Sequence, residues 1–154
     1  MRKKMKGIMF DSRKIDLQSE VLRENKTRTW RPDKKPRYEF GEMVAIKMPY
    51  KYCAGIPHKY IGTPGYTNKM FVKSILMPYR IYITAIKQCN LSDITEEEAR
   101  KEVGDISLTD SNIDFDRLTY KAKFLYIVEK LYGKKFVESN PVGYAYEFKL
   151  IKPI

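Results

Sequence analysis

The sequence has few of the residues that build disulfide frameworks and metal centres. Its 154 residues include two cysteines, Cys53 and Cys89, and one histidine, His58. Two cysteines so far apart suggest neither a disulfide scaffold nor a zinc-finger spacing. No cluster of His, Cys and carboxylate residues has the spacing of a metal site. We therefore predict no bound metal and no cofactor.

Long apolar runs are also lacking. No stretch approaches the roughly 18 uninterrupted apolar residues of a membrane span, and no apolar run follows the charged start as a secretory signal requires. Hydrophobic residues still make up 43% of the chain, which is enough for a packed core. The sequence therefore predicts one cytoplasmic domain over residues 1–154, with no membrane partner.

Acidic residues are outnumbered by basic ones. The chain has 30 Lys and Arg against 19 Asp and Glu, a net charge of +11. Residues 1–37 hold 13 cations and 5 acids, whereas residues 38–154 hold 17 and 14. Positive charge concentrated in this way attracts polyanions, and aromatic rings can stack bases. The charge favours a nucleic acid such as RNA as partner. The alternatives are an acidic protein partner, or a charged face that only keeps the protein in solution.

Hydrophobic periodicity predicts strands interrupted by helices. Strands are predicted at residues 6–10, 26–31, 43–48, 80–86 and 144–150. Helices are predicted from Asp11 or Ser12 to about Asn25, from Asp93 or Thr95 to Gly104, and from Phe115 to Tyr132. Strands and helices do not alternate regularly, so a parallel sheet is disfavoured. We predict an α+β fold, a small mixed or antiparallel β-barrel with two or three peripheral helices.

A loop is predicted over residues 49–78, where Pro, Gly, Tyr and Lys replace any clear periodicity. A loop of about thirty residues inside a compact domain is more often functional or mobile than accidental. Lys51 and Tyr52 combine a cation with an aromatic ring, as surfaces that bind RNA by phosphate contact and stacking do. An equally good interpretation is that the tyrosines of this loop anchor it to the barrel.

Residues 26–31 contain the densest group of side chains suited to binding or catalysis, with three cations and two hydroxyls in six positions. As a strand, the segment places Thr27, Thr29 and Arg31 on one face. A hydroxyl beside a guanidinium, with Lys26 at the start of the strand, can bind a phosphate or form an activated nucleophile. From the segment alone, an exposed strand with solvated charges is the alternative. The candidate ligands for RNA or phosphate are Thr27, Arg28, Arg31, Lys51 and Tyr52.

Five stretches match the pattern of one known family, in order and over nearly the whole chain. The first stretch comprises residues 6–10, the following helix and residues 26–31. The other four are residues 40–46, residues 79–86, residues 91–99 leading into Glu102, and residues 139–148. These stretches resemble the ASCH domain family, small β-barrels related to the PUA RNA-binding fold, and most of all its longer members in phage and prophage genomes. The family usually has Gly-Lys-Lys-Thr-x-Thr-x-Arg after its first helix. Here the loop at 49–78 is longer than in minimal members.

The resemblance implies RNA or nucleotide binding in a cleft between barrel and helices. Some small members are amidohydrolases that remove acetyl from N4-acetylcytidine, and others have been described as ribonucleases. Carried over, Thr29 attacks the amide carbonyl, Lys26 takes the hydroxyl proton and Glu102 passes it to the departing amine. Arg31 matches the arginine of the signature and holds a phosphate or the oxyanion. Glu98 lies one turn from Glu102 on the same helix face and is an alternative to it.

Three functions remain open from the sequence. The first is an RNA- or nucleoside-binding domain with a basic cleft, and the second is hydrolysis of an acylated cytidine amide in that cleft. The third is a non-enzymatic protein-binding or inhibitor module, encoded by a phage, that uses its basic face. If Lys26 stays protonated it becomes a phosphate or oxyanion ligand, which favours binding over catalysis. The first two functions require Lys26, Thr29 and Glu102 to meet at one concave site.

Overall fold

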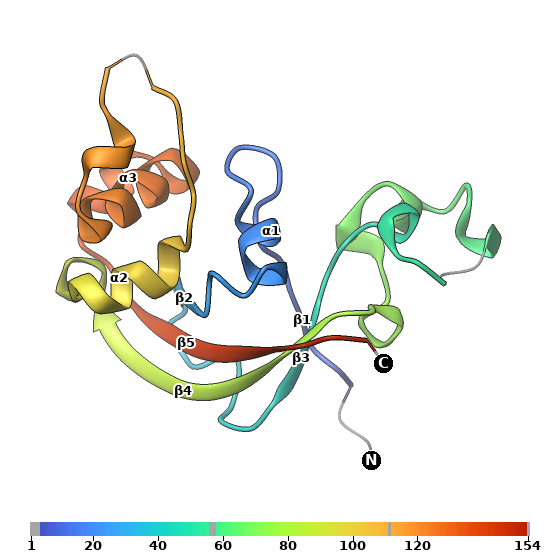
Figure 1. Cartoon of the computed structure of the whole chain (residues 1–154). Helices are drawn as coiled ribbons and strands as arrows, with labels where there is room; N and C mark the ends of the chain where they lie inside the picture. Colours follow the sequence, from blue (N-terminus) through green and yellow to red (C-terminus); the bar gives the residue numbers. More distant parts are fainter. Residues whose placement is uncertain (1–3, 56–57, 111, 154) are drawn as a thin grey trace.

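One mixed sheet organises the fold. The structure, a computed structural model, describes residues 4–55, 58–110 and 112–153, and five strands of these residues form a single sheet in the order β1-β3-β4-β5-β2 (Figure 1). The strands are β1 (Gly7–Ile8), β2 (Arg28–Arg31), β3 (Met43–Ile46), β4 (Arg80–Asn90) and β5 (Val142–Ile151). Strand β1 runs parallel to β3, and the other neighbours are antiparallel. The α+β class and the mixed strand directions are therefore confirmed.

The sheet is open. Among the described residues β1 and β2 form its two edges, and no pairing joins them. The predicted closure into a barrel is not seen, because β1 has two residues and β2 has four, too few to carry the pairing around a full circle. The long central pair β4 and β5 instead curves as a ribbon (Figure 1), with a register shift between Ile83 and Ala85. Such an irregularity bends a strand pair and increases its twist.

Four helices are described: α1 (Leu17–Leu22), α2 (Glu96–Val103), α3 (Tyr120–Tyr132) and α4 (Lys134–Glu138). Helix α2 begins as predicted, because Thr95 and Glu98 form a capping box, and it ends at Gly104 with a φ of 65°. Helix α3 ends at Gly133, also as predicted. The helices α2 and α3 lie together over one end of the β4–β5 ribbon (Figure 1).

Two helix starts were predicted too early. The first helix begins after Asp16, because the Asp11 carboxylate accepts hydrogen bonds from the backbone of Lys14 and Ile15 and closes a separate turn. The left-handed residue that follows this helix is Glu24, with a φ of 64°, and not Asn25. The helix predicted from Phe115 starts at Tyr120, since residues 115–117 form a 3-10 turn.

Residues 49–78 contain neither an α-helix nor a strand where they are described, as predicted, but they are well anchored. Residues 56 and 57 lie outside the described residues. The rest forms short 3-10 turns, namely Tyr50–Tyr52, His58–Tyr60, Pro64–Tyr66, Lys69–Phe71 and Ser74–Leu76. Tyr50 is buried, stacks on Tyr60 at 4.2 Å between ring centroids and accepts a hydrogen bond from the Lys73 backbone. For these two tyrosines the anchoring interpretation is correct, whereas Tyr52 is 68% exposed.

The apolar core lies between the sheet and the helices. It includes Ile81 and Ile83 of β4, Phe148 of β5 and Val103 of α2. Within the described ranges, no helix has the length and apolar character needed to cross a bilayer.

Candidate functional site

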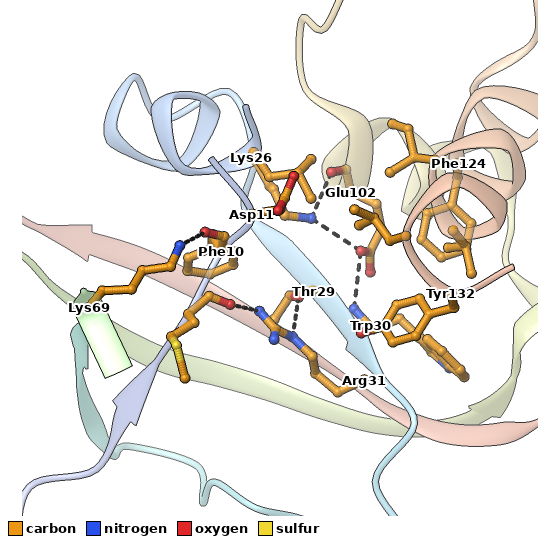
Figure 2. A pocket seen from close by; sticks show the side chains of 15 residues that line it. Phe10, Asp11, Lys26, Thr29, Trp30, Arg31, Lys69, Glu102, Phe124 and Tyr132 are labelled. Carbon is orange, nitrogen blue, oxygen red and sulfur yellow. Dashed lines mark hydrogen bonds and ion pairs between the residues drawn. The ribbon is translucent and has the colours of Figure 1, made fainter. Parts of the chain in front are cut away.

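A cavity of about 330 Å³ lies between β2, the segment after β1, and α3 (Figure 2). Its polar side is lined by Asp11, Lys26, Thr29, Arg31, Lys69 and Glu102. Its apolar side is lined mainly by the α3 residues Phe124, Ile127, Val128, Leu131 and Tyr132. A concave space of this size, apolar on one side and polar on the other, is typical of small-molecule sites.

The three residues predicted to meet do line this one cavity. Lys26 and Thr29 come from the β2 segment, and Glu102 comes from the last turn of α2. The Thr27 backbone N–H donates to the Lys101 carbonyl at 3.0 Å, which holds the end of α2 against the start of β2. This contact places the Lys26 ammonium 3.3 Å from the Glu102 carboxylate, across 76 positions of sequence.

Lys26 is a buried cation with a complete set of partners. Its Nζ donates to the Arg28 carbonyl at 2.8 Å, to the Glu102 carbonyl at 2.7 Å and to Glu102 Oε1 at 3.3 Å. Burial lowers the pKa of Lys26 below its ordinary value, and the Glu102 carboxylate opposes that shift. The three acceptors use the three N–H donors of an ammonium group. In this arrangement Lys26 has no free lone pair with which to take a proton from Thr29.

The Glu102 carboxylate joins three donors beneath the cavity. Its Oε2 accepts from Arg28 Nη1 at 2.8 Å, and its Oε1 accepts from the Trp30 backbone N–H at 3.1 Å as well as from Lys26. The side chain is 3% exposed. A buried carboxylate needs such partners, because an unpaired charge in the interior is very costly. Glu102 therefore orients the β2 segment and lines the cavity at the same time.

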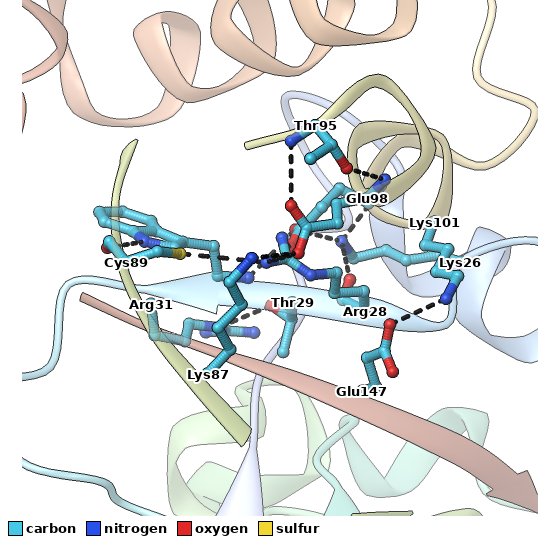
Figure 3. A network of polar contacts seen from close by, with 12 residues as sticks. Lys26, Arg28, Thr29, Arg31, Lys87, Cys89, Thr95, Glu98, Lys101 and Glu147 are labelled. Carbon is cyan, nitrogen blue, oxygen red and sulfur yellow. Dashed lines mark hydrogen bonds and ion pairs between the residues drawn. The ribbon is translucent and has the colours of Figure 1, made fainter. Parts of the chain in front are cut away.

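Glu98 faces a different part of the network. Its Oε2 accepts from Lys87 Nζ at 2.9 Å and from Arg28 Nη2 at 3.4 Å, and it does not line the cavity (Figure 3). Burial acts to raise the pKa of the Glu98 carboxyl, but hydrogen bonds from the Thr95 backbone and from Lys87 outweigh it and hold the pKa at about 2. Of the two candidate glutamates, Glu102 is thus the one at the cavity.

Thr29 and Arg31 form a hydrogen-bonded polar pair that lines the cavity. Arg31 Nε donates to Thr29 Oγ1 at 3.0 Å, and Arg31 Nη2 donates to the Met9 carbonyl at 2.8 Å (Figure 2). The guanidinium carbon lies 5.2 Å from the centroid of the Phe10 ring. The Thr29 oxygen accepts from Arg31, and within the described part of the chain no hydrogen bond has the Thr29 hydroxyl as donor, so this hydroxyl can donate to a ligand. Among the hydrogen bonds of the described residues, none joins Thr29 to Lys26.

Other predicted ligands lie away from the cavity. Arg28 is only 1% exposed and is committed to Glu102 and Glu98, so its prediction as a phosphate ligand is not supported by its position. Thr27 is half-buried and does not line the cavity either. Lys51 and Tyr52 line a neighbouring hollow of about 750 Å³.

Lys69 and Asp11 are polar cavity residues that sequence reasoning did not select as site residues, and Lys69 is the more informative of the two. It lies in the irregular segment, and its Nζ donates to the Phe10 carbonyl at 2.7 Å at the edge of the cavity (Figure 2). No periodicity or motif surrounds it in the sequence, because its position depends on how residues 49–78 fold back onto the segment after β1.

A metal centre is not formed by the side chains that the structure describes, since no three His, Cys, Asp or Glu residues are placed to share an ion. No protein-family model matches the sequence, and neither the curated proteins nor the solved structures gave a significant match.

Proposed function

We propose that the cavity binds a nucleoside, either free or as part of RNA, in a domain of the ASCH type with a PUA-like architecture. The observation that carries the proposal is the convergence of Lys26, Thr29, Arg31 and Glu102 on one cavity that has an apolar wall. These are also the residues that the resemblance to the ASCH family selects.

The two sides of the cavity suit the two kinds of surface on a nucleoside. A base has apolar faces and polar edges, and exposed bases bind against aromatic and apolar side chains. Phe124, Ile127 and Tyr132 offer such contacts on α3. The Thr29 hydroxyl can donate to a carbonyl oxygen of the base. Arg31 keeps Nη1 without a partner among the described residues, so this group can donate to an oxygen or a phosphate.

Hydrolysis of an acylated amino group on the base is a second candidate. The observation that favours it is the Thr29 hydroxyl in a cavity that also holds a buried lysine with a lowered pKa. Thr29 Oγ forms a bond to the amide carbonyl carbon, and the hydroxyl proton passes to a neutral Lys26 amine. The C–N bond then breaks and the amine leaves with a proton delivered through Glu102. Water hydrolyses the resulting threonine ester, which releases the carboxylic acid.

This reaction requires a rearrangement of the resting site. Lys26 must lose its proton and exchange its hydrogen bond to the Arg28 carbonyl for one to Thr29. Arg31, which already contacts the Thr29 oxygen at 3.0 Å, is placed to stabilise the negative charge that develops during attack. Binding needs no such change, and for that reason we rank it first.

Binding can be measured with the single tryptophan of the chain, Trp30, which lines the cavity. Titration with cytidine and N4-acetylcytidine is expected to change its fluorescence in a saturable manner. Thr29→Val is expected to weaken binding about five-fold or more, since a lost hydrogen bond to a buried group costs about 1–3 kcal/mol. Glu97→Gln, on the exposed face of α2, is the control. Absence of saturable binding of either nucleoside at millimolar concentration contradicts the proposal and favours a protein-binding module.

Hydrolysis is tested by following cytidine release from N4-acetylcytidine by chromatography. The wild-type protein and Thr29→Ser are expected to release cytidine, and Thr29→Val is expected to be inactive. If the protein binds N4-acetylcytidine saturably but releases no cytidine, the proposed binding function is supported and the proposed hydrolysis is contradicted. Release at an unchanged rate by Thr29→Val contradicts the role given to Thr29.

A further inference from the structure

The hollow that contains Lys51 and Tyr52 adjoins the cavity. We call it the outer groove; it has a volume of about 750 Å³, and its lining includes Arg13, Lys51, Tyr52, Lys69 and Met70. Met9, Asp11 and Lys69 line both the outer groove and the cavity. A ligand that enters the cavity past these shared residues can therefore continue into the outer groove.

Positive charge collects where the two hollows meet. Burial lowers the pKa of Lys69. Among the neighbouring charges, the carboxylates of Asp11 and Asp16 oppose this shift, while Arg13 and Arg31 add to it. Lys69 is thus within electrostatic range of both arginines, and an anion beside Lys69 relieves this repulsion.

The two carboxylates near Lys69, those of Asp11 and Asp16, accept hydrogen bonds from nearby residues of their own segment. Asp11 accepts from the backbone N–H groups of Lys14 and Ile15, and Asp16 accepts from the backbone and hydroxyl of Ser19 at the start of α1. These bonds stabilise the negative charge of both acids. Lys69 donates to the Phe10 carbonyl at 2.7 Å and to the Ser12 hydroxyl at 3.4 Å, so two of its three N–H donors have partners among the described residues and the third can bind a ligand.

The ring of Tyr52 is exposed, unlike the stacked rings of Tyr50 and Tyr60 in the same segment. Tyr50 and Tyr60 stack on each other, whereas the Tyr52 ring is 68% exposed and the Lys51 ammonium lies 4.8 Å from its centroid. A free aromatic face beside a cation, in a groove, is the arrangement with which proteins hold successive bases and phosphates of single strands.

We propose that the outer groove binds the nucleotides that flank the base held in the cavity, so that the ligand is a residue within single-stranded RNA. This inference rests on the proposed function, because it takes the cavity as a nucleoside site. A free nucleoside fills the cavity and leaves the outer groove empty. A strand places a phosphodiester beside Lys69 and Arg13, and a neighbouring base on Tyr52. A single strand is required because bases in a duplex are not free to enter a cavity or to stack on a side chain.

The test compares a nucleoside with an oligonucleotide on the same protein. The probes are cytidine, followed by Trp30 fluorescence, and a labelled single-stranded RNA octamer with one central cytidine, followed by anisotropy at two salt concentrations. The octamer is expected to bind at least ten-fold more tightly than cytidine. The double variant Lys51→Ala/Tyr52→Ala is expected to lower the ratio of octamer to cytidine affinity about ten-fold, as loss of one stacked base does. Removing Lys51 also reduces the slope of log affinity against log salt by about 0.7.

Lys59→Ala/Tyr60→Phe is a control from the same segment. The Lys59 ammonium lies 5.3 Å from the Tyr60 ring, so the pair resembles Lys51 and Tyr52, yet neither residue lines the cavity or the outer groove. This variant is expected to keep the wild-type affinity ratio.

The outcomes separate the two proposals. If cytidine binds but the octamer binds no more tightly, or if the Lys51/Tyr52 variant keeps the wild-type ratio, the outer groove does not hold flanking nucleotides and the nucleoside site stands. If the octamer binds and cytidine neither binds nor competes with it, the cavity is not a nucleoside site and both proposals are wrong. A variant that loses affinity for both probes equally contradicts the inference, because the outer groove contacts only the longer ligand.

Discussion

Replacement of Glu102 by Gln removes one negative charge from the centre of a buried network. The carboxylate lies 3.3 Å from the Lys26 ammonium and 2.8 Å from the Arg28 guanidinium, and all three side chains are at most 4% exposed. With an effective dielectric constant of about 20, these two attractions amount to about 5 and about 6 kcal/mol. The desolvation cost of burying the three charged groups offsets a large part of this attraction, so the net stabilisation is smaller.

The variant is expected to lose more than the attraction between charges. An amide has one acceptor oxygen, and its NH₂ group then faces donors of Lys26, Arg28 or the Trp30 backbone. Removal of one member of a buried ion pair usually destabilises a protein by about 3–5 kcal/mol. In a domain of this size, about 2–4 °C of melting temperature is lost per kcal/mol. We therefore expect Glu102→Gln to melt roughly 6–20 °C below the wild type.

Thermal denaturation followed by circular dichroism measures this difference, with Glu97→Gln as the matched control. Glu97 is on the same helix but is exposed and contacts Arg100, so its replacement is expected to leave the melting temperature unchanged. In a Lys26→Met background, Glu102→Gln is expected to lower the melting temperature by a smaller amount, because only Arg28 then loses its carboxylate partner. A Glu102→Gln protein that melts within 2 °C of the wild type refutes the reasoning that the buried network contributes to stability.

Three shorter predictions concern β5, the outer part of the network and a thiol. Gly143→Ala is expected to destabilise the protein by about 1–3 kcal/mol in a urea titration, because its Cβ would lie 2.2 Å from the Arg31 carbonyl oxygen; unchanged stability contradicts this packing. The difference in unfolding free energy between wild type and Glu98→Gln is expected to shrink as pH falls from 4.5 towards 2, since the folded-state pKa of Glu98 is lowered to about 2. A difference that stays constant over this pH range contradicts the ion pairs of Glu98. Burial raises the pKa of Cys53 to about 11, so at pH 8 iodoacetamide is expected to label it at least ten-fold more slowly in native than in urea-unfolded protein, as read by mass spectrometry.

Features encoded by neighbouring residues were predicted well. The capping box of Thr95 and Glu98 and the end of α2 at Gly104 follow from hydrogen bonds and backbone conformations within a few positions. The apolar and β-branched pattern of β4 was recognised as far as residue 86. Its last residues were missed because polar side chains from Lys87 to Asn90 obscure the pattern, while their backbone still pairs with β5.

Contacts between distant segments were harder to predict. The choice between Glu98 and Glu102 depends on which turn of α2 rests over β2, and both glutamates have the same local sequence signal. Arg28 looks like a surface cation in the sequence, yet two glutamates of α2 bury and neutralise it. Lys69 reaches the cavity only because residues 49–78 fold back onto the segment after β1.

The sequence by itself determined the strongly basic N-terminal quarter and the α+β class, because charge, periodicity and capping are properties of nearby residues; the candidate set Lys26, Thr29 and Glu102 came from the resemblance of its motifs to a known family. Only the tertiary structure decided that these three side chains share one cavity, that Lys26 is held by acceptors and not by Thr29, and that Lys69 lies at its edge. Packing of α2, α3 and residues 49–78 against the sheet sets these positions, and such packing depends on apolar contacts spread over the whole chain.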